Sequence, residues 1–291
     1  MRILITGGRG QLGRDCREVF ANHTVLALDL PNLDITSEAS VDGVIDLWKP
    51  DAIVNCAAYT AVDRAEHDET KAYAANRDGP RLLASRAKAR DIFLVHISTD
   101  YVFPGNRPVP EPWVETDTPA PASVYGKSKL AGERELDLDG VRHAILRTAW
   151  LYGAHGYNFL KTILRHAVRE PSKGLRVVND QYGTPTWSRR LAEQILAVVE
   201  AQAVGLFHAS GEGWCSWYDF ASEFIRLMGI DCEVRPCATS EYPSATARPA
   251  NSILENAALK RANLNRMRDW KEDLAEYVSR YRDALLREAR G

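Results

Sequence analysis

The sequence has few cysteines, little net charge and no long apolar run. Only five of its 291 residues are cysteine, and no two have the C-x-x-C spacing of zinc or redox sites. The 37 basic residues nearly balance the 39 acidic ones, for a formal net charge of −2. No uninterrupted apolar stretch approaches the ~20 residues that span a bilayer. These absences favour reduced thiols over a disulfide framework and predict a small-molecule ligand, with no nucleic acid or membrane partner.

What is present is typical of an ordinary globular protein, with 45% hydrophobic and 26% charged residues. Because no signal-like apolar leader precedes the first strand-like run, we expect a cytoplasmic protein. Short apolar runs alternate with helical patterns such as those at 40–49 and 78–90, which is the βαβ signature of a parallel, doubly wound sheet. The strand-like runs lie at 2–6, 24–29, 52–58, 92–98 and 144–151.

A glycine-rich turn, TGGRGQLG, follows the first of these runs. Its glycines fit two registers, one of Gly7, Gly10 and Gly13 and the other of Gly8, Gly10 and Gly13. A strand, a tight glycine turn and a helix start together form the cradle of a dinucleotide pyrophosphate, because glycine lets backbone N–H groups approach the phosphates. The turn alone can also be a purely structural connection.

We therefore predict an α/β protein, a doubly wound parallel Rossmann sheet with a smaller α+β substrate-binding region. Residues 1–150 would form the NAD(P)-binding domain and 151–291 mainly the substrate-binding region, with a segment near 174–203 returning to the first domain. The proline-rich stretch at 104–123 can neither pair as a strand nor propagate a helix, so we expect a surface loop beside the site.

Tyr125 and Lys129 stand four residues apart at the start of a helical pattern, which places both side chains on one face. A lysine cation near a phenol lowers the pKa of that phenol, so the tyrosine can exchange a proton near neutral pH. Tyr157 and Lys161 have the same spacing, so spacing alone does not choose between the pairs. Thr99 favours the first pair, because its hydroxyl follows a strand-like run and could face the phenol across a substrate carbonyl.

Beyond these features, nine stretches of the chain match one family. They are TGGRGQLG, LDLPNLDIT, NCAAYTAVDRAE, HISTDYVFPG, VYGKSKLAGE, LRTAWLYG, NFLKTIL, NDQYGTPTW and ARPANSILEN. With them the chain resembles the extended short-chain dehydrogenase/reductase family nearly end to end. The resemblance implies a reductase of a 4-keto nucleotide sugar, with Thr99, Tyr125 and Lys129 as the catalytic triad. Tyr125 would protonate the C4 oxygen, Thr99 would polarise the carbonyl, and Lys129 would lower the pKa of Tyr125 and hold the nicotinamide ribose.

The resemblance also implies the binding residues. It selects the register of Gly7, Gly10 and Gly13, and it leaves Gly8 as local slack. The cofactor residues that it implies are Gly7, Arg9, Gly10, Gln11, Leu12, Gly13, Asp29, Asp34, Ile35, Ala57, Ala58, Tyr59, Thr60, Tyr125 and Lys129. The substrate residues that it implies are Thr99, Asp100, Tyr125, Trp150 and Asn158.

Two signals for the cofactor conflict. Arg9 can reach a 2′-phosphate and favours NADPH, whereas Asp29 can accept from a free ribose hydroxyl and would repel that phosphate. We therefore predict that both NADPH and NADH are used. Some members of the family carry a divalent ion between subunits. Here Asp15 stands where a glutamate is usual, and Arg189 and Arg190 lie near another expected acid. We predict no metal, and either a monomer or a homodimer.

Several residues also have plainer interpretations. Trp150 alone would be a core aromatic, and Asp63 and Glu66 would form a charged helix entry. His96 lies inside a strand pattern with no second histidine at ligand spacing, so we interpret it as a hydrogen-bonded structural residue. The alternative functions are a non-catalytic regulatory subunit and a nucleotide-sugar epimerase or dehydratase of the same fold. The complete triad favours the reductase over the regulatory subunit, and no single residue decides between the reductase and an epimerase or dehydratase.

Overall fold

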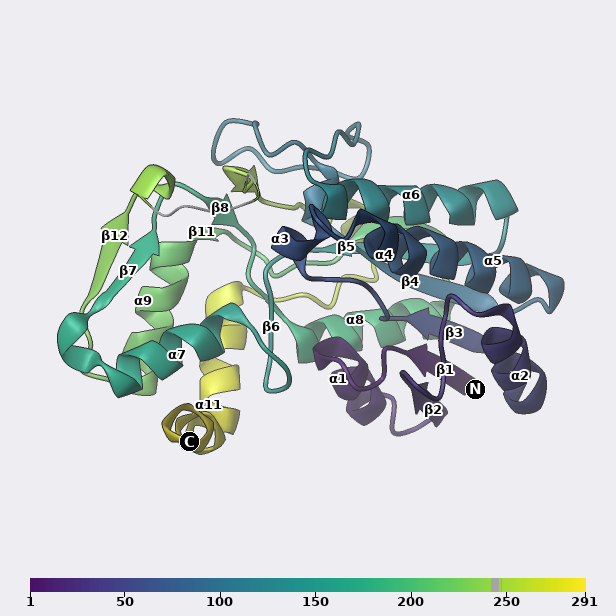
Figure 1. The fold of residues 1–291 in the computed structure, drawn as a ribbon, viewed down its shortest axis with the longest axis horizontal. Coiled ribbons are helices and arrows are strands. Elements are labelled where there is room, and N and C mark those ends of the chain that lie inside the picture. The colour runs from purple at the N-terminus through teal and green to yellow at the C-terminus, as the bar shows by residue number, and fades with distance from the viewer. Residues whose placement is uncertain (242–245, 247) are drawn as a thin grey trace.

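A six-stranded parallel sheet organises the larger part of the computed structural model, which describes residues 1–241, 246 and 248–291 (Figure 1). Its strand order is β10-β5-β4-β3-β1-β2. The chain steps to one side of β1 for β2 and to the other side for β3, which confirms the predicted doubly wound sheet. The strands are β1 (Arg2–Thr6), β2 (Thr24–Leu28), β3 (Ala52–Asn55), β4 (Phe93–Thr99), β5 (His143–Thr148) and β10 (Gly205–His208).

Helices cover both faces of this sheet (Figure 1). Ile3 and Ile5 pack on the face of α1 and α8, whereas Leu4 packs on the face of α2, α5 and α6, because successive side chains of a strand point to opposite sides. Both faces are apolar, as a buried parallel sheet requires. The helices are α1 (Gln11–Val19), α2 (Glu38–Trp48), α5 (Gly79–Ala89), α6 (Val124–Asp139) and α8 (Ser188–Ala201).

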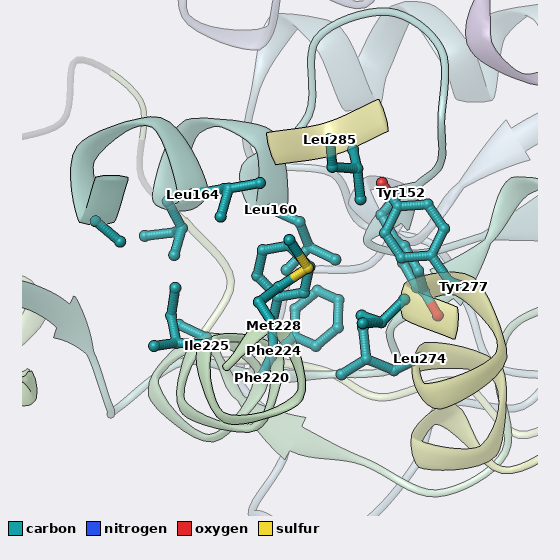
Figure 2. Close-up of a cluster of buried hydrophobic side chains, with 14 of the residues drawn as sticks. Tyr152, Leu160, Leu164, Phe220, Phe224, Ile225, Met228, Leu274, Tyr277 and Leu285 are labelled. Atoms are coloured by element: carbon teal, nitrogen blue, oxygen red, sulfur yellow. The ribbon is translucent and has the colours of Figure 1, made fainter. Parts of the chain in front are cut away.

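A second, smaller region is built mainly from α7, α9 and α11, which enclose an apolar core of their own (Figure 2). It is the predicted α+β region, because short strands pair beside these helices: β7 with β12, and β8 with β11 and β13. Its elements are α7 (Phe159–Arg169), β7 (Leu175–Val178), β8 (Tyr182–Gly183), β11 (Cys215–Ser216), α9 (Trp217–Met228), β12 (Val234–Cys237), β13 (Asn251–Ser252) and α11 (Trp270–Arg290).

Part of the second half of the chain returns to the sheet. α8 packs against α1, and β10 pairs with β5 at the edge. The expected returning segment, 174–203, begins too early, because β7 pairs with β12 inside the second region. The returning segment therefore starts at α8 and extends through β10. The expected division of the chain at residue 150 stays a prediction.

The remaining elements are short. Residues 104–123 contain no longer pairing than a single bridge from Trp113 to Leu254. Over the described part of the chain, no helix combines the length and the apolar character that crossing a membrane requires. The short elements are α3 (Val62–Ala65), α4 (Glu69–Tyr73), η1 (Ala74–Asp78), η2 (Asp100–Val102), β6 (Leu151–Tyr152), η3 (Pro171–Lys173), β9 (Thr186–Trp187), η4 (Thr239–Glu241) and α10 (Ala257–Arg261).

Candidate active site

The glycine turn between β1 and α1 lies closely against both neighbouring strands. A Cβ on Gly7, whose φ is +65°, would lie 2.7 Å from Ala57 N, and one on Gly13 would lie 2.3 Å from Gly7 O. A Cβ on Gly8 would lie 2.8 Å from the carbonyl carbon of Ala27 on β2. The expectation that Gly8 is local slack is therefore wrong. The turn needs glycine in both registers, and the backbone N–H groups at the start of α1 remain free for an anion.

A cavity of about 760 Å³ runs from this turn past the carboxyl ends of β1 to β5. Ligands of parallel α/β sheets bind at this edge. Of the predicted site residues, Arg9, Tyr59 and Asn158 do not line the cavity. Those that line it are Gly7, Gly10, Gln11, Leu12, Gly13, Asp29, Asp34, Ile35, Ala57, Ala58, Thr60, Thr99, Asp100, Tyr125, Lys129 and Trp150.

Asp29 and Arg9 meet at the β2 end of the cavity. The carboxylate of Asp29 accepts from Leu30 N at 2.8 Å and from Arg9 N at 3.2 Å. The guanidinium of Arg9 donates to Leu30 O at 3.2 Å. A fixed carboxylate and an exposed cation therefore stand side by side where the sequence predicted the adenosine ribose.

Within the loop after β3, Tyr59 is anchored outside the cavity lining. Tyr59 N donates to Asn76 Oδ1 at 2.8 Å, and the Tyr59 hydroxyl donates to Asp68 Oδ2 at 3.0 Å. These bonds tie the loop to α4 and η1 and keep the tyrosine ring out of the cavity lining.

Asp34 uses its carboxylate locally, because Oδ1 accepts from both N and Oγ1 of Thr36, at 2.9 and 2.7 Å.

Thr99 ends β4, and Tyr125 lies in the first turn of α6. Ser123 caps this helix by accepting from Gly126 N at 3.1 Å. Gly126 allows the first turn of α6 to approach η2, since a Cβ there would lie 2.2 Å from Tyr101 O. As a result, Tyr125 and Thr99 line the same end of the cavity.

The ionisation of Tyr125 differs from the expectation. Burial raises the pKa of the phenol, and the neighbouring Thr99 hydroxyl only partly opposes this rise. Lys129 Nζ donates instead to Ile97 O at 2.6 Å, near the carboxyl end of β4. Burial lowers the pKa of Lys129 to about 8. The predicted lowering of the Tyr125 pKa by Lys129 is therefore not met by this geometry.

The rival pair, Tyr157 and Lys161, is separated in space. Lys161 Nζ donates to both carboxylate oxygens of Glu288 on α11, at 2.8 and 3.0 Å. The Tyr157 side chain is 91% exposed at the rim of the cavity. Only Tyr125 has both a lysine on its own helix face and a threonine hydroxyl opposite.

Asp100 and Trp150 line the cavity beside Thr99. Asp100 is 4% exposed, accepts from Thr99 Oγ1 at 2.9 Å, and has its pKa raised to about 6 by burial. Trp150 has a φ of +46°, stacks on Trp217 with ring centroids 3.4 Å apart, and donates from Nε1 to Ser252 Oγ at 3.1 Å. Trp150 thus forms a wall between the sheet and the second region.

Asn158 has a structural place instead of a place in the cavity wall. It caps α7 by accepting from Lys161 N at 3.2 Å. Its Nδ2 donates to Gln11 Oε1 and to Gly153 O, both at 2.9 Å. The side chain holds the loop before α7 against the start of α1.

The sequence motifs did not indicate Tyr101, which lines this end of the cavity, or Arg248, which binds it. The Tyr101 ring lies edge-on to the Tyr125 ring, with centroids 5.6 Å apart. Arg248 donates to the Tyr101 hydroxyl at 2.9 Å and to Asp63 Oδ2 at 2.7 Å. Tyr101 follows Thr99 at the end of a buried strand, and this position was the available signal. Arg248 lies in a quoted stretch, ARPANSILEN, but nothing in its spacing indicates a contact with Tyr101.

The acidic residue considered for a metal is already engaged. Asp15 is buried and accepts a hydrogen bond from Ser188 Oγ, and burial raises the pKa of Asp15. Arg190 pairs with Asp273 at 3.1 Å. Among the residues that the structure describes, no cluster of three or more histidine, cysteine, aspartate or glutamate side chains is arranged to hold a metal ion.

A parallel sheet, a glycine turn and a Y-x-x-x-K helix around one cavity define a Rossmann-fold oxidoreductase. The model of the family described as RmlD substrate binding domain matches residues 1–283, and the chain belongs to that family. A dTDP-4-keto-6-deoxy-D-glucose reductase of Streptomyces niveus is 40% identical over 279 residues, which cover 94% of this chain and 96% of that protein. A dTDP-4-dehydrorhamnose reductase of Aggregatibacter actinomycetemcomitans is 39% identical over 288 residues, covering 94% and 97%. The crystal structure of dTDP-4-dehydrorhamnose reductase from Bacillus anthracis, in complex with NADP, is 37% identical with a TM-score of 0.92, covering 96% of this chain and 99% of that chain.

Replacing Gly8 tests the packing of the glycine turn. Gly8→Ala should lower the free energy of unfolding by ~1–3 kcal/mol, because the new methyl overlaps the backbone of β2. The matched control is Gly43→Ala in α2, where a Cβ meets no atom within 4 Å. That change should stabilise the protein by ~0.5–1 kcal/mol. Urea denaturation measures the free energy of unfolding of both variants. A Gly8→Ala protein as stable as the parent would show that position 8 does not require glycine.

Proposed function

We propose that this protein is an NAD(P)H-dependent reductase that converts dTDP-4-dehydro-6-deoxy-L-mannose (dTDP-4-dehydrorhamnose) to dTDP-L-rhamnose in the cytoplasm. The convergence of Thr99, Tyr125 and Lys129 at one end of a cavity that begins at the glycine turn carries the proposal. The names of its family relatives support the substrate class, a nucleotide sugar with a keto group at C4.

The reduction requires one hydride and one proton at the C4 carbonyl. NADPH or NADH, when bound, supplies the hydride. Tyr125 donates the proton to the C4 oxygen, and its raised pKa keeps the phenol protonated near neutral pH. The hydroxyl of Thr99, which donates to Asp100 in the structure, would donate to the substrate carbonyl instead and polarise that carbonyl. Lys129 lines the same end of the cavity and would hold the nicotinamide ribose.

The glycine turn fits a dinucleotide. Gly7 and Gly13 let the turn pack against neighbouring backbone without side chains in the way. A pyrophosphate can therefore lie against the N–H groups that begin α1. Asp29 is oriented by two backbone N–H groups and accepts from a ribose hydroxyl. Arg9 is exposed next to it and attracts a 2′-phosphate.

The other end of the cavity fits a deoxysugar. Asp100 Oδ2 is buried and has no hydrogen-bond partner among the described residues, so it can accept from a sugar hydroxyl. The ring of Trp150, fixed by Trp217, presents an apolar face to the 6-deoxy carbon. We propose these two residues as the sugar contacts.

The test mixes the purified protein with NADPH and one 4-keto nucleotide sugar at a time while the absorbance of reduced nicotinamide is followed. The sugars are dTDP-4-dehydrorhamnose, dTDP-4-keto-6-deoxy-D-glucose and a UDP-linked 4-keto sugar. We expect the fastest NADPH oxidation with dTDP-4-dehydrorhamnose. A changed sugar with no net oxidation would identify an epimerase or dehydratase, and no reaction with any sugar would favour a regulatory subunit.

Two tyrosine variants complete this test. Tyr125→Phe should reduce kcat by ~10²–10⁴-fold, because it removes the proton donor, and it should leave NADPH binding largely unchanged. Tyr157→Phe is the matched control and should keep near-normal turnover, since that ring is exposed. The reverse pattern would show that the other Y-x-x-x-K pair is catalytic.

Cofactor choice provides a separate prediction. Arg9→Ala should shift the ratio of kcat/KM values toward NADH, and Asp29→Asn should shift it toward NADPH. Each contact is worth on the order of 1–3 kcal/mol, so each shift should be about fivefold or more. Steady-state kinetics with both cofactors measure the ratio. An unchanged ratio in Arg9→Ala would leave Asp29 as the cofactor selector.

A further inference from the structure

A row of buried polar side chains crosses the sheet and ends at Lys129. Thr6 on β1 is in register with Asn55 on β3, and Asn55 is in register with His96 on β4. All three side chains are 0–1% exposed, and Lys129 is 2% exposed. The last residues of β1 and β3 and the middle of β4 thus form one polar line across the sheet. The proposed chemistry uses only the last member of this line.

The hydrogen bonds along the row have one consistent direction. Ala57 N donates to Thr6 Oγ1 at 3.4 Å, and the Thr6 hydroxyl donates to Asn55 Oδ1 at 2.6 Å. The amide nitrogen of Asn55, which can only donate, then faces His96 Nδ1 at 3.0 Å. The opposite amide orientation would direct two donors at Thr6 Oγ1 and remove the acceptor of its own proton.

This direction selects the tautomer of His96. Its Nδ1 must carry a lone pair, so the neutral ring carries its proton on Nε2. Burial and the nearby Lys129 hold the pKa of His96 well below its usual range, and the ring is therefore neutral. Its Nε2 lies 3.4 Å from Lys129 Nζ. An N–H thus points at the amine of the lysine.

We propose that His96 is a positioning residue for the reduction: Thr6 and Asn55 fix its ring so that the Nε2–H faces Lys129 and weakens the hold of that lysine on its proton. A donor facing an ammonium repels it, whereas a neutral amine can accept from the same donor. The inference rests on the proposed role of Lys129 in the reaction.

Other groups around Lys129 act in the opposite sense. Burial lowers the pKa of Lys129 to about 8, whereas Glu133, one turn along α6, and Cys56, just after β3, both raise it. Glu133 is itself paired with Arg147 at 2.6 Å, which limits its pull on the lysine. Tyr125, on the same helix face, stays protonated because burial raises its pKa. His96 is the neighbour that directs a donor at the amine.

The proposal predicts a pH dependence. kcat/KM for NADPH reports groups of the free enzyme. Lys129 is charged below its pKa and loses its charge as pH rises, so this quantity should fall above about pH 8. If the donor on His96 is removed or turned away, Lys129 keeps its charge to higher pH, and the fall should move upward.

The first experiment reads the tautomer directly by ¹⁵N NMR of the histidine-labelled full chain, with His96→Leu used to assign the signal. We expect a neutral ring protonated on Nε2 between pH 6 and pH 9. A proton on Nδ1, or a ring that titrates in this interval, would overturn the proposal. Neither result depends on turnover, so a failure here is distinct from a failure of the proposed reductase activity.

The second experiment changes Thr6, whose hydroxyl is hydrogen-bonded to Asn55 and Ala57 N. Thr6→Val removes the hydroxyl that orients Asn55, so the fall of kcat/KM at alkaline pH should shift to higher pH by about one unit. The matched control is Thr186→Val, a fully buried threonine of β9 that binds Thr184 O. It should change only the melting temperature.

His96→Leu is the second variant, for the case that Thr6→Val does not fold. It removes the donor outright and should also shift the alkaline fall of kcat/KM to higher pH. If kcat/KM of a folded His96→Leu or Thr6→Val protein falls at the same alkaline pH as that of the parent, the proposal is wrong. His96 is then only the hydrogen-bonded structural residue that the sequence suggested.

Discussion

The catalytic end of the molecule depends on one close contact, that of Gly126 with the backbone carbonyl of Tyr101. No side chain larger than hydrogen fits there, because a Cβ would lie 2.2 Å from that oxygen. The contact sets the height and rotation of α6 against the end of β4. It therefore brings Tyr125 to Thr99 and, one helical turn later, carries Lys129 to the backbone of Ile97.

A buried ion pair holds the same helix further along. Glu133 accepts from Arg147 Nε at 3.0 Å and from Nη2 at 2.6 Å, and Ser98 Oγ donates to the same carboxylate. Removing one partner of a buried pair typically costs ~3–5 kcal/mol, because the other charge is left without a partner. This carboxylate links α6 to Ser98 on β4 and to Arg147 on β5, so the residue before Thr99 is tied to the helix.

The fold could be predicted from the sequence because both of its signals are local. Apolar runs and helical patterns alternate along the chain, Thr99 ends a strand, and Tyr125 and Lys129 lie in the first two turns of a helix. The pair of Tyr125 and Lys129 could not be separated from Tyr157 and Lys161 by spacing. The difference lies in partners far along the chain, such as Glu288 for Lys161.

The predictions that the structure did not bear out also depend on partners far along the chain. Gly8 is required by Ala27 on the neighbouring strand, and Asn158 is occupied by Gln11, 147 residues away. The direction of Lys129 is set by burial and by a carbonyl of β4, neither of which is visible in a Y-x-x-x-K spacing. Residue types at the site were predictable, but the partner of each hydrogen bond depends on strand register and helix packing.

The most direct measurement of this account is the rate of hydride transfer in Gly126→Ala in a single turnover, with NADPH and dTDP-4-dehydrorhamnose both saturating. The contact between α6 and η2 predicts a fall of about 10²-fold or more, the value of a misplaced proton donor, in a protein that still folds and binds NADPH. Gly43→Ala, which meets no neighbour, should react at the parental rate. A Gly126→Ala protein that transfers hydride within twofold of the parent, on the order of experimental scatter, would contradict the account.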